Sequence, residues 1–339
     1  MGNDHEALPW LRAPLSSALQ AQQAHALLVT GSAGIGQFEF AMALAQAWLC
    51  ETPASQRADG LACGHCEGCR LVAQRSHPDM RLLVPEAWRA QAGLSADDTG
   101  DADEGKKRKP SQEIKVDQVR GALDFSERTA GRAPLKVVVV HPAEALNAVS
   151  ANALLKTLEE PPGNMRFVLG CGAADSLLPT IRSRCQSIVL KAPDRAQALA
   201  WLAAQGLPDA GPLLDACGGL PLAARDQAAA GRDAAAWQAF PALVMRGDAA
   251  ALAAWPLPVL AEALGRLCYD ATALATGAQA RFFPAWRPRA LPQGPGGLAQ
   301  LTACAAALRR FARQADHPWN AGLAVESLVM QVRGALHAA

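Results

Sequence analysis

The chain has 339 residues, half of them hydrophobic. A single hydrophobic core usually stops growing before this size, so we expect two or three domains. The net charge of +1 comes from 32 basic and 31 acidic residues, which gives no overall field that would attract nucleic acid or an anionic membrane. Any contact with DNA must therefore be local or come from partners.

Targeting signals are not evident. The first ten residues carry Asp4 and Glu6 and have no apolar core, so they do not read as a signal peptide. The apolar runs are shorter than the roughly eighteen residues that span a bilayer. Glu6 also stands where the myristoylation pattern after Gly2 requires Ser or Thr. We therefore expect a cytoplasmic protein with no membrane association.

Strands and helices are predicted to alternate in the first part of the chain. Four apolar strands are expected, at residues 26–30, 135–140, 165–170 and 186–190. The second reads LKVVVV, which is typical of a central parallel strand covered on both faces. Helices are expected over 38–50 and 150–160, the latter ending at Pro161 because proline lacks an amide donor. This alternation predicts a doubly wound α/β domain.

Beyond the last predicted strand, alanine, leucine and tryptophan recur at helical spacing. We expect an α/β domain over 1–192, a small helical domain over 193–232 and a helical C-terminal domain over 233–339. Residues 93–112 are an acidic block followed by a basic one, with almost nothing apolar to bury. That composition favours a disordered surface loop over an arm that binds DNA or a partner.

The loop after the first strand has the glycine placement of a P-loop, in which backbone amides at a helix N-terminus cradle phosphates. Its glycines are Gly31, Gly34 and Gly36. A working P-loop continues with a lysine for the phosphates and a hydroxyl for magnesium, but this chain has Gln37 and Phe38. We therefore expect a strand-to-helix turn that binds no ATP.

A second loss falls at the end of the strand over 135–140, where an ATPase would carry its acidic residues. His141 and Pro142 stand there instead. Proline has no side-chain acceptor, and histidine prefers softer metals than magnesium. Glu144 lies two residues too late. Two independent losses in one site predict that the chain alone does not hydrolyse ATP.

Four of the nine cysteines are clustered, namely Cys50, Cys63, Cys66 and Cys69. Their spacing can close a tetrahedral zinc site, and in a cytosolic chain such clustering favours metal over disulfides. His65 is an alternative ligand. Four protein ligands would leave no open coordination position, so the sequence predicts a structural Zn²⁺ module over about 50–70 rather than a catalytic metal.

The string NALLKTLEEPP at 152–162 indicates, by periodicity alone, an amphipathic helix that ends at prolines. As a string it resembles the hallmark helix of the AAA+ subunits of bacterial clamp loaders. The triplet SRC at 183–185 is similar to the arginine-finger motif of that family. With HPD at 77–79 and IKVD at 114–117, the resemblance extends over most of residues 8–192.

The resemblance implies a RecA-like AAA+ α/β domain with an inserted zinc module, a helical lid domain and an α-helical collar domain that joins a hetero-pentamer. By analogy, Cys50 is the fourth zinc ligand. The motor subunits (gamma/tau) of the family keep the P-loop lysine and the acids, so their loss here implies a non-hydrolysing stator. Arg184 would then be an arginine finger acting in trans; the plain alternative is a solvated or salt-bridged arginine.

The partners implied are the motor subunits and the delta subunit and, through the complex, the sliding clamp and primed DNA. The resemblance also implies a role in DNA replication, as part of DNA polymerase III, a DNA-directed DNA polymerase. Two rival functions stand beside this one. An autonomous AAA+ ATPase is disfavoured by Gln37, His141 and Pro142. A zinc-containing nucleic-acid-binding protein is disfavoured by the neutral net charge and by the compact cysteine cluster.

Overall fold

The computed structural model describes residues 8–21, 24–94, 110–127, 131–314 and 319–337. The chain divides into two compact units, Met1–Ala192 and Pro193–Ala339, which are treated separately below. Most of the loop predicted at 93–112 lies outside the described residues.

The first unit is built on a parallel five-stranded sheet with the order β2-β3-β4-β1-β5. Its strands are β1 (Ala26–Thr30), β2 (Met80–Leu83), β3 (Lys136–Val140), β4 (Met165–Cys171) and β5 (Gln186–Val189). The first strand lies between the last two, so the strand order reverses beside it. Open α/β sheets bind ligands at the carboxyl ends of strands at such a point.

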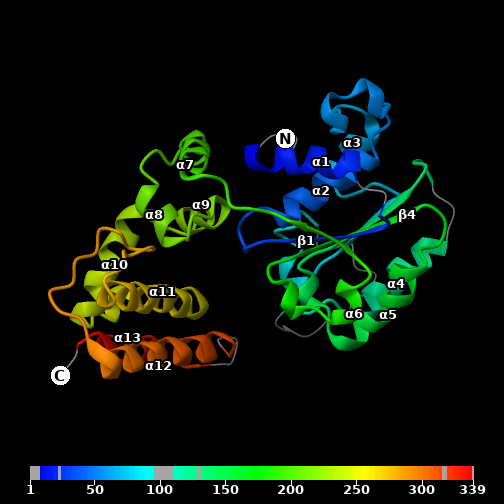
Figure 1. The fold of residues 1–339 in the computed structure, drawn as a ribbon. Helices are drawn as coiled ribbons and strands as arrows, with labels where there is room; N and C mark the ends of the chain where they lie inside the picture. The colour runs from blue at the N-terminus through cyan, green and yellow to red at the C-terminus, as the bar shows by residue number, and fades with distance from the viewer. Residues whose placement is uncertain (1–7, 22–23, 95–109, 128–130, 315–318, 338–339) are drawn as a thin grey trace. The chain divides into compact units, whose positions relative to one another are not determined.

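Helices cover both faces of this sheet. The helices of this unit are α1 (Arg12–Ala21), α2 (Gln37–Trp48), α3 (Glu67–Ala73), α4 (Val116–Glu127), α5 (Ala148–Glu159) and α6 (Pro179–Arg182), of which α1 and α3 pack on α2. Figure 1 shows α2 on one side of the sheet and α4 and α5 on the other. Alternate strand residues such as Leu28, Val138 and Phe167 pack with α4 and α5, because successive side chains of a strand point to opposite faces.

The predicted α/β character of the N-terminal part is confirmed, and the four predicted strands are present within a residue or two of their expected bounds. Helix α2, which follows the P-loop glycines, begins at Gln37 rather than at the predicted Phe38. Gly36 is its N-cap and takes a left-handed conformation (φ 110°). It ends at Trp48, two residues early. The edge strand β2 was not predicted, because its four residues include the charged Arg81 and show no clear period.

The described residues of the second unit form helices joined by loops and contain no strand, in agreement with the predicted α-helical character of this part. Its helices are α7 (Arg195–Ala204), α8 (Gly211–Ala216), α9 (Pro221–Ala229), α10 (Ala234–Arg246), α11 (Leu257–Ala275), α12 (Gly294–Ala312) and α13 (Ala321–Leu336). An aromatic cluster fills part of its core, with the Trp237 and Trp255 rings 4.9 Å apart and the Phe240 and Phe283 rings 5.7 Å apart. None of the helices in the described part of the chain has both the length and the apolar character needed to cross a membrane.

Candidate functional site

The P-loop glycines lie between β1 and α2, at the carboxyl end of the sheet. Gln37, at the position of the P-loop lysine, is 4% exposed and turns its side chain back onto the loop. Its Nε2 donates to the carbonyl oxygens of Gly31, Ser32 (3.1 Å) and Cys171 (3.3 Å). The amide therefore ties the loop to the end of β4 without bringing a positive charge.

Phe38 and His141 close the same site with rings instead of magnesium ligands. Both are buried, and their ring centroids lie 5.4 Å apart. The indole of Trp88 contacts both, at 6.0 Å from the Phe38 ring and 4.8 Å from the His141 ring. Trp88 was missed in the sequence, because nothing in its neighbourhood marks it as part of this cluster. The place of the hydroxyl and of the acid is thus packed as a small aromatic core.

Burial lowers the pKa of His141 to about 4, so the imidazole is neutral at physiological pH. Its ring lies against the backbone of Gly170, where a Cβ atom would approach Nδ1 to 2.7 Å. Glycine at this position allows the histidine to pack there. Glu144, which lies too late to replace the missing acid, instead accepts a hydrogen bond from the Gly172 amide at 2.9 Å.

Arg184 lies between the short helix α6 and the edge strand β5, and its side chain is 29% exposed. Its Nε and Nη2 donate to Oε2 of Glu159 at 3.2 and 3.1 Å. Its Nη1 donates to the Thr180 carbonyl oxygen at 3.0 Å. Glu159 is the last residue of α5, so the guanidinium bridges two elements at the surface of the unit.

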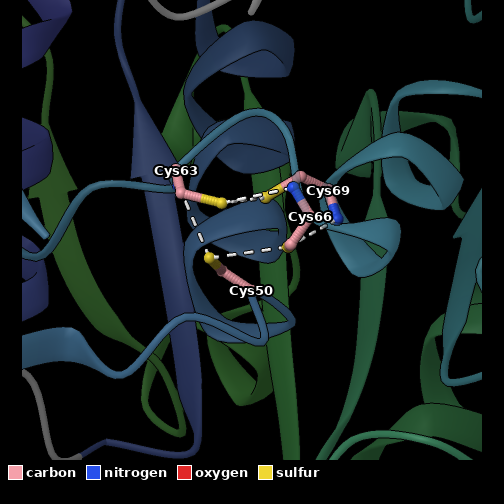
Figure 2. Close-up of side chains that lie close together, drawn as sticks. All are labelled: Cys50, Cys63, Cys66 and Cys69. Carbon is pink, nitrogen blue, oxygen red and sulfur yellow. Dashed lines mark hydrogen bonds between the residues drawn. The ribbon is translucent and has the colours of Figure 1, made fainter. Parts of the chain in front are cut away.

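The side chains of the four clustered cysteines lie close together, as Figure 2 shows. Cys50 follows α2, and Cys69 lies within α3. Their sulfur atoms all lie within 4.8 Å of one another, and the Cys63–Cys69 and Cys50–Cys66 pairs are each 3.9 Å apart. A zinc ion about 2.3 Å from four tetrahedral sulfurs would set them roughly 3.8 Å apart. The geometry fits a four-thiolate metal centre. His65 turns its Nδ1 to the Cys63 carbonyl oxygen at 2.9 Å.

Backbone amides surround the sulfurs. The amides of Cys66 and Cys69 lie 3.4 Å from the sulfurs of Cys63 and Cys66 respectively. Burial raises the pKa of the Cys63 thiol, but hydrogen bonds from Thr52 and from nearby amides outweigh it and lower the pKa to about 5. Gly68 allows the turn, since a Cβ there would lie 2.5 Å from the Leu49 carbonyl oxygen. At Cys63 the hydrogen bonds favour thiolate, the form that binds metal, whereas burial raises the pKa of the Cys69 thiol.

A second set of contacts joins this module to the sheet. Arg132, in the loop before β3, pairs with Glu51, which follows the first clustered cysteine. Asp79 accepts hydrogen bonds from the amides of residues 131, 132 and 133 at 2.6 to 2.7 Å. Burial acts to raise the pKa of Asp79, but these amides lower it overall. The sequence contained this residue in its HPD string, but no local pattern assigned it the task of holding the loop.

Fold and site together define a parallel α/β domain in which side chains fill the position of a P-loop phosphate site and which carries a four-cysteine cluster. The family model described as DNA polymerase III, delta subunit, matches residues 11–194. This match covers more than half of the chain, and the chain belongs to that family.

Individual relatives also carry the names of DNA polymerase III subunits. DNA polymerase III subunit delta' of Pseudomonas aeruginosa is 41% identical over 64% of this chain and 60% of its own length. The subunit of that name from Escherichia coli is 35% identical over 57% and 52%. The chain thus matches only about half to three fifths of these relatives. DNA polymerase III subunit tau of Escherichia coli is 32% identical over half of this chain and 22% of its own length.

Among solved structures, a DNA polymerase III gamma subunit-related protein from Thermotoga maritima aligns over 96% of this chain and 99% of its own. The identity is 18% and the TM-score 0.43.

Proposed function

We propose that this chain is the non-hydrolysing, delta-prime-type stator of a bacterial DNA polymerase III clamp loader. In this role it would supply Arg184 in trans to ATP bound on a neighbouring motor subunit. Family membership and the delta'-named relatives support the setting. The likeness to a tau subunit supports a place among related ATPases.

The observation that carries the proposal is a contrast within one domain. The chain's own phosphate site is closed by Gln37, Phe38 and His141, which are buried and uncharged. Arg184, by comparison, lies at the surface on the side of α5 and α6. A domain that has lost hydrolysis but presents an arginine can still act on a neighbour's ATP.

In the proposed mechanism, Arg184 stabilises the charge that develops on the γ-phosphoryl group during transfer to water. A guanidinium supplied in this way raises hydrolysis by about 10³- to 10⁵-fold in well-characterised systems. Its planar fork suits phosphate oxygens better than the point charge of lysine. The chain itself would act as a fixed neighbour, with no nucleotide cycle of its own.

The assembly belongs to the same proposal. The partners would be gamma/tau motor subunits and a delta subunit in a hetero-pentamer that loads the sliding clamp onto primed DNA. Within the helical unit, residues 193–232 would form the lid domain and 233–339 the collar domain.

We further propose that Cys50, Cys63, Cys66 and Cys69 hold one structural Zn²⁺. When bound, zinc would fasten the loop between α2 and α3 with four thiolates, and no coordination position would remain for a reacting molecule. The backbone amides that donate to the cysteine sulfurs and the spacing of the four sulfurs support this assignment.

The test is an alanine substitution in the reconstituted complex. Arg184→Ala should leave the chain folded and assembled, yet lower ATP hydrolysis stimulated by clamp and primed DNA. The fall should be partial, because the other ATP sites would use arginines of other subunits. Arg184→Lys should recover only part of the loss. Arg182→Ala, which removes a nearby exposed arginine paired with Asp175, is the matched control. A normal rate of clamp loading by the Arg184→Ala complex would show that this arginine is not a finger.

A further inference from the structure

The Arg184 guanidinium is already occupied by its own chain. Its Nε and one Nη2 hydrogen point to a single oxygen of Glu159, at 3.2 and 3.1 Å. Its Nη1 donates to the Thr180 carbonyl oxygen at 3.0 Å and reaches the Ser183 hydroxyl at 3.5 Å. Guanidinium has five N–H donors in a rigid fork, so these contacts leave little of the fork for a phosphate.

The two groups of contacts differ in origin. The Thr180 and Ser183 oxygens belong to the turn that carries the arginine and move with it. Glu159 comes from another element, the end of α5, 25 residues earlier in the chain. Its carboxylate takes the Nε/Nη2 edge, which is one of the edges that arginine offers to a phosphate for two parallel hydrogen bonds. A phosphate that uses this edge must replace Glu159.

Charge and exposure favour such a replacement. The Glu159 side chain is 59% exposed, so water can solvate its carboxylate once the arginine leaves. Pairs this exposed contribute little to stability, and the attraction is partly screened. A terminal phosphate of ATP carries more negative charge than one carboxylate and binds the fork with charge-assisted hydrogen bonds. The carboxylate can therefore hold the arginine without holding it irreversibly.

We propose that Glu159 is a latch for Arg184. Its carboxylate holds the guanidinium on the chain's own surface, and the γ-phosphate of ATP on a neighbouring subunit must displace it before the arginine can act. This inference rests on the proposed function of Arg184. The latch lowers the engaged fraction of the finger in the unstimulated complex and so widens the difference between resting and stimulated hydrolysis.

The first measurement addresses the contact in the isolated full-length chain. Glu159→Gln keeps the size of the side chain and removes its charge, and Glu160→Gln, at the exposed next residue, is the matched control. In protein labelled with ¹⁵N-arginine, the Nε–H resonance of Arg184 should shift in the Glu159 variant. It should stay in place in the Glu160 variant. An unchanged Arg184 resonance in Glu159→Gln would overturn the latch whatever the ATPase data show.

The second measurement uses the reconstituted complex. Glu159→Gln should raise ATP hydrolysis without DNA by about two- to fivefold, the factor that an exposed ion pair can contribute to an equilibrium. The rate of ATP hydrolysis with clamp and primed DNA should be unchanged. The ratio of the stimulated to the resting rate should therefore fall by the same factor. Glu160→Gln should behave as the unmodified complex. An unchanged or lower resting rate in Glu159→Gln would overturn the latch.

Combining substitutions distinguishes failure of the latch from failure of the arginine-finger role proposed for Arg184. In the Arg184→Ala background, Glu159→Gln should have no effect, because the latch acts only through the arginine. A rise of the same size in that background would overturn the latch and leave the finger intact. If Arg184→Ala alone leaves stimulated hydrolysis unchanged, the finger assignment fails, and with it the latch, even where the resonance shift shows the ion pair.

Discussion

Three residues change what the carboxyl ends of β1, β3 and β4 can bind. Gln37 reaches loop carbonyl oxygens with an amide that carries no charge, so it closes the loop on itself. Phe38 and His141 fill the space beside it with ring contacts, and burial keeps the imidazole neutral. Each replacement is individually modest. Together they fill the position of a P-loop phosphate and magnesium site with a hydrogen-bonded amide and two packed rings, a group of side chains that we call the plug.

This plug should make folding stability depend on pH through His141. Its folded pKa of about 4 lies below the ordinary value of 6.5, so the unfolded chain binds more protons between those values. Stability is therefore complete above about pH 6.5 and is lost as the pH falls toward 4. At pH 5 the expected loss from this residue is roughly 2 kcal/mol.

Urea unfolding at pH 7.5 and pH 5 measures the effect. His141→Phe cannot titrate, so its stability should fall less between the two pH values than that of the unmodified chain, by about 2 kcal/mol. The comparison cancels other groups, including His77, whose pKa burial also lowers. Equal losses in the two proteins would mean that His141 is not held neutral by the fold.

At the scale of elements, most strands of the sheet could be predicted from the sequence, whereas the contacts of side chains far apart in the chain could not. Continuous apolar stretches such as 26–30 and 135–140 are strands because both faces are covered, and burial of this kind leaves a clear mark on composition. The edge strand β2 has a mixed burial pattern, so its four residues carry no comparable signal.

The cysteine cluster and the P-loop glycines were likewise visible in the sequence, since their spacing is local. Trp88 and Glu159 were not visible as site residues, because Trp88 contacts Phe38 50 residues away in the chain and Glu159 contacts Arg184 25 residues away. Asp79 holds the loop at 131–133 through backbone amides, which leave no imprint on side-chain identity. Long-range and backbone-mediated contacts are thus the part that required the structure.

The module between α2 and α3 should depend on its metal. The chain should contain about one zinc per molecule by elemental analysis, and Cys69→Ser should abolish it, because a structural site needs all four thiolates. Hydrogen exchange should then rise over residues 50–70 and stay low in the strands of the sheet. Cys217→Ala, at a buried thiol of the helical unit, should retain zinc. Stoichiometric zinc in Cys69→Ser would contradict the assignment.

At the scale of the whole molecule, one unit carries the filled P-loop position and the partly exposed Arg184, and the described residues of the other form helices and no strand. Neither feature by itself specifies a task. A P-loop position filled by side chains is also expected in an enzyme that has lost its activity. A partly exposed arginine paired with a glutamate is common on protein surfaces. Their combination in a chain of this family supports the proposed division of roles, in which neighbouring subunits would bind the nucleotide and this chain would supply the arginine.

That division predicts that the isolated chain neither binds nor hydrolyses Mg-ATP. A P-loop binds Mg-ATP with a lysine that neutralises the phosphates and a hydroxyl that coordinates magnesium. The buried Gln37 and Phe38 stand at these two positions and provide neither group. Equilibrium dialysis with Mg-ATP should therefore give no saturable binding, with a motor subunit as the positive control. The double substitution Gln37→Lys with Phe38→Thr should not restore hydrolysis, because His141 and Pro142 still occupy the position of the acids and neither can orient magnesium. Saturable Mg-ATP binding by the unmodified chain would contradict this prediction, and turnover by the double variant would show that His141 and Pro142 do not prevent hydrolysis.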